Sequence, residues 1–481
     1  MLEILPLPKK YNTVDQSTHP ILPSVYTAES EWIDDANTFC GIFEKIFNLP
    51  ISVAEPAGIR LKKNPTLSQN EYTLDTCGDS VLLCASAREG LLYGLATALQ
   101  LIDCKNGTPA VASVQITDSP AQEYRAFMLD AVSKPQSMKQ LFKYIDLCFF
   151  YKINYLHLHF ADGAAFRYPS KRLEALPSKF HYSEEDIVQL RSYASSRGIK
   201  LVPEIECPGH ATILNRSYPE HFHCDMEGNG EVLLSELGDP INPESLICAG
   251  SEKSFEAVKA LIDELAELFP DSEYIHIGGD EAPHNCWAHC KACRAYMEQH
   301  GLKSTKELYS EYVGRIASYV LSIGRKPIVW EGFASESSHF VPKETIVIAW
   351  ESHYQTAPDL LKNGFRIINA SWQPTYFVPS LVHRWDAEKV LSWDPHVWEH
   401  WWEQSEAYEK PISIEPTEAL LGASLCAWGL SFELLIGRLM ENLPAFSQCL
   451  WSPDEKPDFT IFYTIYKKIG DKAARLALDE F

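Results

Sequence analysis

The chain has 481 residues, with 42 lysines and arginines against 65 aspartates and glutamates, and therefore a formal net charge of −23. Hydrophobic residues make up 46% of it and charged residues 22%, which excludes a mainly disordered chain because the apolar surface suffices for a core. The negative charge argues against nucleic-acid binding, and the length predicts roughly three domains, or fewer where one is a large barrel.

Residues 1–120 are predicted to form a separate small α+β domain. The segment 71–86 is typical of two strands around a Cys-Gly-Asp turn, and 88–103 has apolar residues at helical spacing. Pro109 and Pro120 then interrupt the pattern before the next segment.

From residue 121 onward, apolar runs suited to buried strands alternate with amphipathic stretches suited to helices. Eight such units favour parallel pairing and closure into an α/β fold, the (β/α)8 or TIM barrel, which we expect to span residues 121–450. A doubly wound sheet is the alternative, but no glycine-rich turn follows an early strand. Residues 451–481 are predicted to form a helical extension packed on the barrel. The predicted strands are 125–132, 153–160, 199–206, 273–279, 326–332, 345–352, 365–371 and 420–428.

Polar residues at the carboxyl ends of the strands are the candidates for chemistry, because barrel active sites form there. The sharpest motif is HIGGDE, residues 276–281, in which Gly278 and Gly279 relax the backbone so that Asp280 and Glu281 can face one pocket. Two carboxyl groups so close to each other do not both ionise readily, so the pKa of one of them rises above its ordinary value. A raised pKa suits a general acid beside a charged partner. The alternative is that the pair only caps the next helix.

HIGGDE resembles the signature of glycoside hydrolase family 20, the β-N-acetylhexosaminidases. Other motifs match that family in order, namely YRAFMLDAV (124–132), HLHFADGAAFR (157–167), VPEIECPGH (202–210) and the tryptophans at strand ends. The segment 71–101 is also similar to the small domain that precedes the barrel in these enzymes, so the resemblance covers nearly the whole chain. It implies an exo-acting, retaining enzyme that removes terminal β-linked GlcNAc or GalNAc from a carbohydrate without a cofactor or a catalytic metal.

The resemblance also implies roles for individual residues. The substrate's own 2-acetamido oxygen attacks the anomeric carbon, an oxazolinium ion forms, and water opens it with net retention. Glu281 is implied as the general acid and base, and Asp280 as the group that orients the acetamido nucleophile. His210, with Glu206 behind it, is implied as a carboxylate–histidine–carboxylate relay. The implied substrate-binding residues are Arg125 for ring hydroxyls, Asp162, Tyr376 for the acetamido carbonyl, and Trp330, Trp350 and Trp428 as pocket walls.

The chain departs from the family pattern at three positions. Leu430 stands where the family commonly has a glutamate that contacts the distal sugar hydroxyls, and Glu433 or an acid within 386–403 is a candidate replacement. Gly163 replaces an aspartate, and Lys134 replaces an expected arginine. The choice between GlcNAc and GalNAc is therefore open, as are the aglycone, the linkage and the oligomeric state.

Two further groups of residues are unusual. Residues 372–407 hold six of the twelve tryptophans, and we expect a helix that packs most of them on the barrel, with one or two as a platform for a sugar. Cys286, Cys290 and Cys293 have partial metal-site spacing, but a closed zinc site needs four ligands. Unligated thiols and a structural zinc completed by Cys207 or Cys224 both stay open.

The sequence also predicts a compartment. Glu3, Pro6 and Pro8 stand where a secretory signal needs an uninterrupted apolar stretch, and no segment has the roughly 18 consecutive apolar residues that span a bilayer. The 13 cysteines are an odd number scattered along the chain, which is typical of reduced thiols. We therefore expect a cytoplasmic protein without membrane contact.

Two other functions remain as alternatives. His157 and His159 would share one strand face, as in metal-dependent barrel hydrolases, and His210, His276 and Asp280 could complete a metal site. The second alternative is a noncatalytic sugar-binding barrel, in which the Asp280-Glu281 pair would be dispensable.

Overall fold

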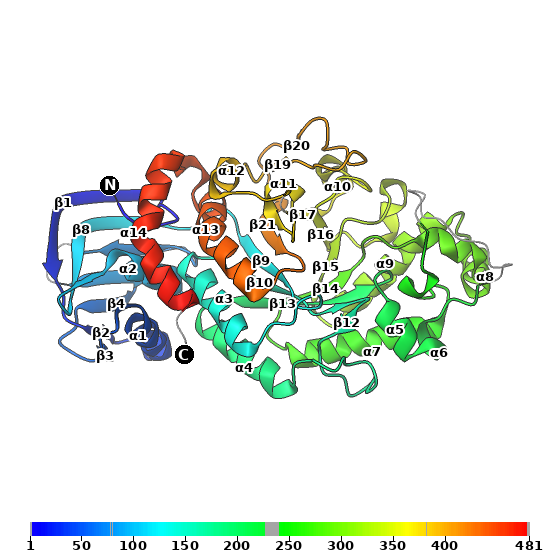
Figure 1. Cartoon of the computed structure of the whole chain (residues 1–481), viewed down its shortest axis with the longest axis horizontal. Coiled ribbons are helices and arrows are strands. Elements are labelled where there is room, and N and C mark those ends of the chain that lie inside the picture. The colour runs from blue at the N-terminus through cyan, green and yellow to red at the C-terminus, as the bar shows by residue number, and fades with distance from the viewer. Residues whose placement is uncertain (1, 77, 79, 227–239, 381, 479–481) are drawn as a thin grey trace.

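A sheet domain and a closed barrel lie side by side in the computed structural model, which describes residues 2–76, 78, 80–226, 240–380 and 382–478 (Figure 1). The C-terminal helix α14 (Phe459–Ala477) lies across the junction between them. It contacts α1 (Ile33–Phe47) of the sheet domain together with α3 (Met138–Phe150) and α13 (Phe432–Trp451) of the barrel. The C-terminal helix therefore packs on both parts of the chain, whereas the sequence predicted packing on the barrel.

The N-terminal domain is one mixed sheet with two helices on it. Its strands run in the order β1-β8-β5-β6-β4-β2-β3, with β7 paired to β8. The predicted strand pair within 71–86 is the antiparallel pair β5–β6, and the predicted helix is α2 (Arg88–Leu101). The strands are β1 (Lys10–Pro20), β2 (Ser24–Thr27), β3 (Ser52–Val53), β4 (Ile59–Lys63), β5 (Tyr72–Asp75), β6 (Val81–Ala85), β7 (Asp103–Lys105) and β8 (Thr108–Asp118).

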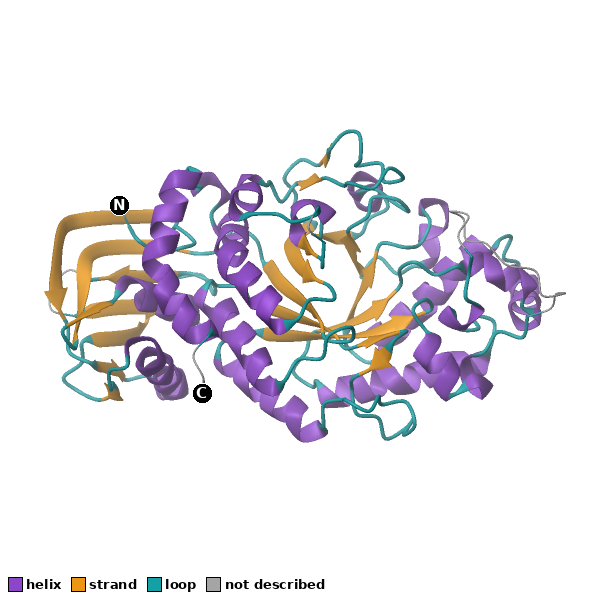
Figure 2. Cartoon of the chain, in the orientation of Figure 1, coloured by secondary structure: helices purple, strands orange, loops and turns teal. Residues whose placement is uncertain are grey.

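Eight parallel strands close into a barrel, and helices surround it (Figure 2). Closure comes from the pairing of the last strand, β21, with both β9 and β17. All eight predicted strands are strands of this barrel, which confirms the predicted fold class. They are β9 (Tyr124–Asp130), β10 (Tyr155–His159), β13 (Lys200–Cys207), β14 (Tyr274–Gly278), β15 (Lys326–Trp330), β16 (Ile346–Ala349), β17 (Arg366–Asn369) and β21 (Leu420–Ala427).

The helices outside the barrel begin at local sequence signals. Ser137 caps α3 and Ser183 caps α4, each in a reciprocal capping box with the residue three positions on. The remaining helices of eight or more residues outside the barrel are α4 (Glu184–Ser196), α7 (Glu252–Leu268), α8 (Lys291–His300) and α9 (Thr305–Ser322).

Residues 372–407 do not form the predicted helix. Their regular elements are α11 (Trp372–Thr375), β18 (Tyr376–Phe377), α12 (Ala387–Ser392) and β19 (Val397–Trp398). The tryptophans are anchored one by one: Trp393 stacks on Phe446 of α13, and the Trp398 indole donates a 2.9 Å hydrogen bond to the Ala349 carbonyl. Each ring therefore binds a different part of the barrel, and a single helical stripe could not do this.

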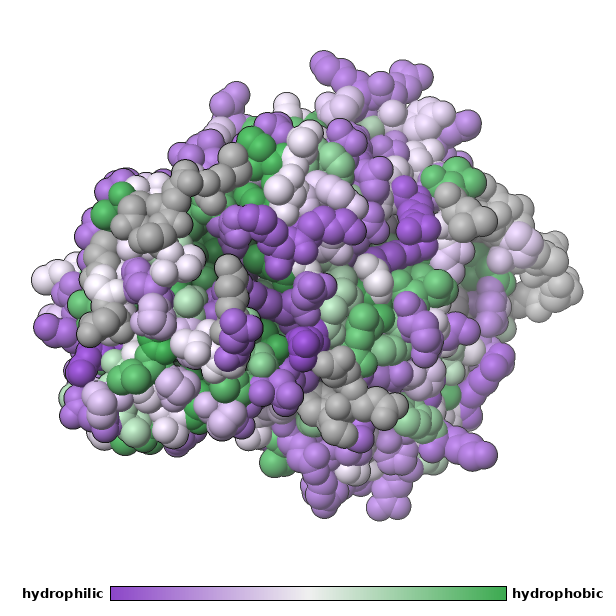
Figure 3. Space-filling view, turned by 60° about the vertical axis from the view of Figure 1, so that its left-hand side comes forward, coloured by the Kyte–Doolittle hydropathy of each residue, from purple (hydrophilic) through white to green (hydrophobic). Residues whose placement is uncertain are grey.

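Among the described residues, no helix is both long and apolar enough to cross a membrane. On the face shown in Figure 3, hydrophilic side chains cover most of the surface between smaller hydrophobic patches. This agrees with the excess of acidic residues in the sequence.

A buried charged cluster joins the two parts of the chain. Asp118, at the end of β8, accepts hydrogen bonds from the Tyr72 hydroxyl at 2.8 Å and the Trp451 indole at 2.9 Å, and pairs with Lys152 at 3.3 Å. All four side chains are buried. Burial lowers the pKa of Lys152 to about 8, although Asp118 counteracts it. Asp118 thus links the sheet domain, the barrel and α13 through one carboxylate.

We predict that Asp118→Asn destabilises the protein by about 3–5 kcal/mol, because it leaves the Lys152 ammonium buried without its counter-charge. The measurement is the midpoint of urea unfolding. Glu55→Gln, which breaks the exposed ion pair with Arg60, is the control and should leave the midpoint unchanged. Equal midpoints for Asp118→Asn and the wild type would contradict this.

Candidate active site

The barrel interior changes from apolar to charged along the strands. Residues at alternate strand positions form a separate buried cluster inside the barrel, where Tyr124 and Tyr155 stack 4.4 Å apart near the strand starts. His157 follows Tyr155 by two positions on β10, and Glu204 follows the buried Val202 by two positions on β13. The alternation therefore carries polar groups from the middle of the barrel toward the carboxyl ends of its strands.

Glu204 is fully buried, and its carboxylate contacts ring nitrogens of three histidines and one tryptophan. Its Oε2 lies 2.6 Å from His159 Nδ1 and 3.1 Å from His157 Nε2. Its Oε1 lies 2.9 Å from His276 Nδ1 and accepts the Trp330 indole N–H at 2.7 Å. Burial opposes its ionisation, but the three histidines outweigh burial and hold the pKa of Glu204 well below its usual range. The site therefore rests on a buried carboxylate.

Asp280 and Glu281 follow β14 in a left-handed turn. Gly278 has φ +69°, Gly279 φ +94° and Glu281 φ +43°. The positive φ of Gly278 favours glycine, and a Cβ there would also displace the Glu206 carboxylate. The turn brings both carboxyl groups to one cavity, which confirms the geometric reason given for the HIGGDE motif.

His210 connects these two acids to Asp162. Its Nε2 lies 3.3 Å from Glu281 Oε2 and 3.6 Å from Asp280 Oδ2, while its Nδ1 lies 3.3 Å from Asp162 Oδ1. The other Asp162 oxygen lies 3.3 Å from His159 Nε2. Carboxylates and imidazoles thus alternate from Glu204 through His159, Asp162 and His210 to Glu281.

The pKa shifts follow from this alternation. Burial disfavours a charged His210, but the surrounding carboxylates outweigh it and raise the pKa of His210 well above its usual value. His210, whose Nε2 lies 3.3 Å from Glu281 Oε2, lowers the pKa of Glu281, whose side chain is about half exposed. Burial raises the pKa of Asp280 to about 6, assisted by the negative charge of Glu281 and opposed by His210. The two adjacent acids therefore have pKa values shifted in opposite directions.

An aromatic cavity of about 300 Å³ opens beside these groups. The Tyr376 ring lies between Trp350, at 6.0 Å, and Trp372, at 4.6 Å, and stacks with both. Among the described residues, the Tyr376 hydroxyl and Asp280 Oδ1 are buried without a hydrogen-bond partner. The cavity is lined by His159, Asp162, Glu206, His210, Asp280, Glu281, Trp330, Trp350, Trp372, Tyr376, Val378 and Trp428.

Glu331 shapes one wall of the cavity without lining it. This buried carboxylate, next to Trp330, accepts backbone N–H groups of Trp350 and of residues 352–355, at 2.9 to 3.3 Å. Burial raises its pKa, and these backbone donors counteract the shift. Its carbonyl also accepts the Trp350 indole N–H at 2.9 Å. The loop after β16 therefore holds Trp350 through main-chain contacts.

The predicted position of Arg125 is wrong. Arg125 is fully buried near the start of β9, at the opposite end of the strand from the cavity. Its guanidinium donates to the carbonyls of Lys152 and Gln122 and to the Tyr93 hydroxyl, and lies 5.1 Å from the centre of the Trp451 ring. All of these partners are at the domain junction, so Arg125 has a structural position there and does not reach a ligand in the cavity.

The predicted relay is wrong in one member. Asp162, rather than Glu206, lies behind His210. Glu206 Oε1 lies 3.7 Å from His159 Nδ1, and burial together with Asp280 and Glu204 raises the pKa of Glu206 well above its usual range. Glu206 is two residues farther along β13 than Glu204 and so lies on the same strand face, which directs it toward His159.

The other predicted site residues, Asp162, His210, Asp280, Glu281, Trp330, Trp350, Tyr376 and Trp428, all line the cavity. Trp372 also lines it, so one tryptophan of the 372–407 segment does contribute to the cavity wall. Leu430 and the exposed Glu433 are not among the lining residues, and Val378 is. His159 and Glu206 were not assigned to the cavity from sequence, although polar residues at alternating positions of a buried strand are a signal that could have identified them.

The metal site of the alternative hydrolase is not assembled in this arrangement. His157 and His276 bind Glu204 inside the barrel, whereas His210 and Asp280 lie at the cavity. The donor atoms therefore fall into separate groups, each already containing carboxylates that pair with its imidazoles.

Two family descriptions match the chain. "Glycosyl hydrolase family 20, catalytic domain" matches residues 122–453, and "Glycosyl hydrolase family 20, domain 2" matches residues 3–119. Together they cover both the barrel and the sheet domain.

Curated relatives agree with these matches. The chain is 30% identical to the "Beta-hexosaminidase subunit beta" of Sus scrofa over 416 residues, which are 83% of this chain and 73% of that protein. It is 30% identical to the "Beta-hexosaminidase" of Akkermansia muciniphila and 29% identical to that of Porphyromonas gingivalis, over 65% and 96% of this chain. The chain spans 65% and 62% of the length of these two bacterial proteins, which is less than two thirds.

Solved structures share the fold. A GH20 exo β-N-acetylglucosaminidase from Vibrio harveyi superposes with a TM-score of 0.85 at 24% identity, over 98% of this chain and 77% of that one. A β-N-acetylhexosaminidase from Bacteroides fragilis superposes with a TM-score of 0.79 at 24% identity, over 97% and 94% of the two chains. Both likenesses support the same barrel and preceding domain.

We predict that Asp280→Asn stabilises the protein by about 3 kcal/mol near neutral pH. Folding raises the pKa of Asp280 to about 6, above its unfolded value, so the folded state loses stability as pH rises through that range. The gain from the variant should therefore be full at about pH 7.5 and shrink toward about pH 4.5. Urea midpoints at both pH values measure it, with the exposed Glu409→Gln as control, and a pH-independent difference would contradict it.

Proposed function

Since the chain belongs to glycosyl hydrolase family 20, we propose that it is an exo-acting, retaining β-N-acetylhexosaminidase that removes terminal β-linked GlcNAc or GalNAc from a carbohydrate. One observation carries the proposal. The unpartnered Asp280 Oδ1 and Tyr376 hydroxyl line the same aromatic cavity as Glu281. An acceptor and a donor in an apolar cage match the N–H, the carbonyl and the methyl group of a 2-acetamido substituent.

In the proposed reaction the substrate supplies its own nucleophile. The acetamido carbonyl oxygen attacks C1 while the bond from C1 to the leaving oxygen breaks, and Glu281 gives a proton to that oxygen. Asp280 accepts the acetamido N–H and balances the positive charge of the oxazolinium ion. Water then adds to C1 while the bond from C1 to the acetamido oxygen breaks and Glu281 takes a proton from the water, so the product keeps the β configuration.

His210 sets the protonation state that the first step needs. In the free enzyme its raised pKa and the lowered pKa of Glu281 place the shared proton on the imidazole. A leaving group that displaces water from Glu281 removes solvation from the carboxylate and raises its pKa. The proton then passes from His210 Nε2 to Glu281 Oε2 across the 3.3 Å contact. Asp162, which holds His210 Nδ1, acts as a positioning residue for this transfer.

The cavity walls also support a proposal about recognition. Trp330, Trp350, Tyr376 and Trp428 enclose the acetamido group and the apolar sugar face, and Trp372 extends this wall. Val378 also lines the cavity, so a bound sugar would make apolar contacts there in addition to its hydrogen bonds.

We also propose that the enzyme works in the cytoplasm. The 13 cysteines are an odd number scattered along the chain, which is typical of reduced thiols in that compartment.

The test of the reaction is a comparison of aryl β-glycosides of GlcNAc, GalNAc and glucose. We expect the enzyme to cleave one or both of the first two and to cleave the glucoside slower by on the order of 10³-fold or more, because glucose carries no internal nucleophile. Equal rates on the glucoside would contradict substrate assistance. Binding of GlcNAc without turnover of any of the three would support the noncatalytic barrel instead.

A second prediction concerns the general acid. Glu281→Gln should lower kcat about 10²–10⁴-fold on substrates with poor leaving groups and much less on activated aryl substrates, which leave without a proton. Steady-state kinetics on a natural-type disaccharide and an activated aryl glycoside measure the difference. Glu433→Gln, an exposed residue outside the cavity, is the matched control and should leave both rates unchanged. Equal losses on both substrates would contradict the acid role.

A further inference from the structure

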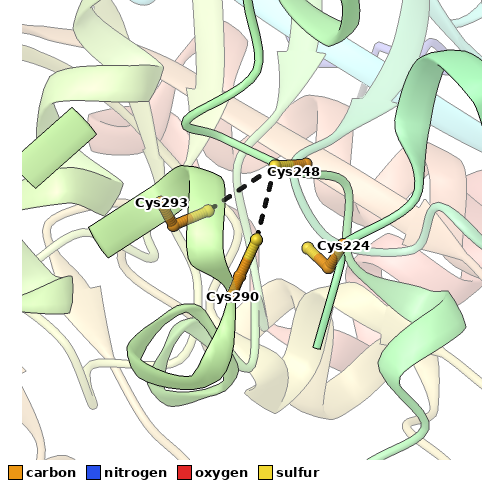
Figure 4. A group of neighbouring side chains, drawn as sticks. All are labelled: Cys224, Cys248, Cys290 and Cys293. Carbon is orange, nitrogen blue, oxygen red and sulfur yellow. Dashed lines mark hydrogen bonds between the residues drawn. The ribbon is translucent and has the colours of Figure 1, made fainter. Parts of the chain in front are cut away.

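Four buried cysteines converge on one point outside the active-site cavity. They are Cys224, Cys248, Cys290 and Cys293, each at most 2% exposed, and their sulfur atoms all lie within 4.8 Å of one another (Figure 4). Figure 4 shows Cys224 and Cys248 reaching the group from separate loops, while Cys290 and Cys293 belong to the start of α8. Three chain segments thus supply four soft ligands.

The spacing of the sulfurs matches tetrahedral coordination of a single metal ion. Cys248 Sγ lies 3.6 Å from Cys290 Sγ and 3.7 Å from Cys293 Sγ. A zinc ion binds thiolates at about 2.3 Å, and a tetrahedron of that size has sulfur–sulfur edges of about 3.8 Å. The sulfurs of a disulfide would lie much closer together, at about 2.0 Å, and all four cysteines are free. A four-iron cluster would hold its cysteines farther apart.

The backbone around the cluster supplies the N–H donors that thiolate ligands need. The Gly250 N–H donates to Cys293 Sγ at 3.4 Å. A Cβ at Gly250 would lie 2.5 Å from the Ala292 carbonyl oxygen, so only glycine allows the loop to come this close to α8. Such donors orient metal ligands and offset their negative charge.

We propose that Cys224, Cys248, Cys290 and Cys293 bind a structural zinc ion. Four protein ligands close the coordination sphere, which is typical of structural zinc rather than of a catalytic metal. The partial spacing noticed in the sequence is therefore completed by Cys224 and Cys248. The predicted third member, Cys286, is buried in the preceding 3₁₀ turn and lies outside the group, and Cys207 also lies outside it.

The zinc would connect two loops that carry active-site residues, the loop after β13 and the loop after β14. The loop after β13 holds His210, and its Cys248 segment is bonded back to the loop start through the Ala211 N–H to Ser245 carbonyl contact at 2.9 Å. The loop after β14 holds Glu281 and continues to Cys290 and Cys293. The Trp287 indole joins the loops directly, donating to the Ile247 carbonyl at 3.0 Å. Zinc therefore supports the contact of His210 with Glu281 from outside the cavity.

The first experiment uses the full-length protein as purified, without added metal. We expect elemental analysis to find one zinc ion per chain and native mass spectrometry to show the matching mass, lost on denaturation. Reconstitution of the stripped protein with Co²⁺ should give the visible bands of a tetrahedral cobalt–thiolate site. Iron in place of zinc, or less than stoichiometric metal with four titratable thiols or two disulfides, would overturn the assignment.

The second experiment uses matched variants. Cys248→Ser and Cys293→Ser should lose the zinc and lower Tm by on the order of 10 °C, whereas Cys286→Ser, a buried cysteine four residues before Cys290, should retain it. Zinc retained in both cluster variants, or lost in Cys286→Ser as well, would contradict the ligand set. If the cluster variants fail to fold, the metal content and native mass of the wild type decide the question alone, and neither depends on the activity.

Discussion

The active site is built on the balance between buried carboxylates and imidazoles. Its described lining residues include no lysine or arginine, so histidines alone offset the charge of the acids. His157, His159 and His276 hold the pKa of Glu204, inside the barrel, well below its usual range, although burial lowers the pKa of His276 itself to about 4. His159 passes this pairing to Asp162, and the chain of contacts ends at His210 with Asp280 and Glu281. Because imidazoles, unlike guanidinium groups, exchange protons near neutral pH, this balance also makes the site able to move a proton.

This arrangement of the site costs folding free energy at a few positions. His210 and Glu281, neither of them glycine, both adopt positive φ, and burial of Asp280 disfavours its charge at neutral pH. Two features of the remainder of the molecule offset this loss of folding free energy. They are the closed pairing of the barrel strands and the buried junction around Asp118 and Arg125. The arginine at the start of β9 thus contributes to holding the two domains together, and the chemistry is left to the opposite end of the same strand.

The sequence was sufficient for the barrel because each of its eight strands is a short apolar run between amphipathic segments. It was also sufficient for Asp280 and Glu281, since two glycines directly precede them after a buried strand. The resemblance misplaced Arg125 in the substrate site, although the predicted strand 125–132 begins at this residue and barrel active sites form at the other end of the strands. Asp162 was not identified as the partner of His210 because the two residues lie beyond the ends of β10 and β13, where the contact depends on how the following loops fold. Cys248 was missed because it is far in the chain from the CxxC pair of Cys290 and Cys293.

Glu331 has a consequence for how the rim of this barrel can vary in sequence. Its carboxylate holds the loop after β16 by backbone N–H groups, which every residue except proline carries. A change of the Tyr354 side chain would therefore leave these backbone bonds and the indole bond of Trp350 in place. The rim of the barrel can therefore vary at this loop without rebuilding the Trp350 wall of the cavity.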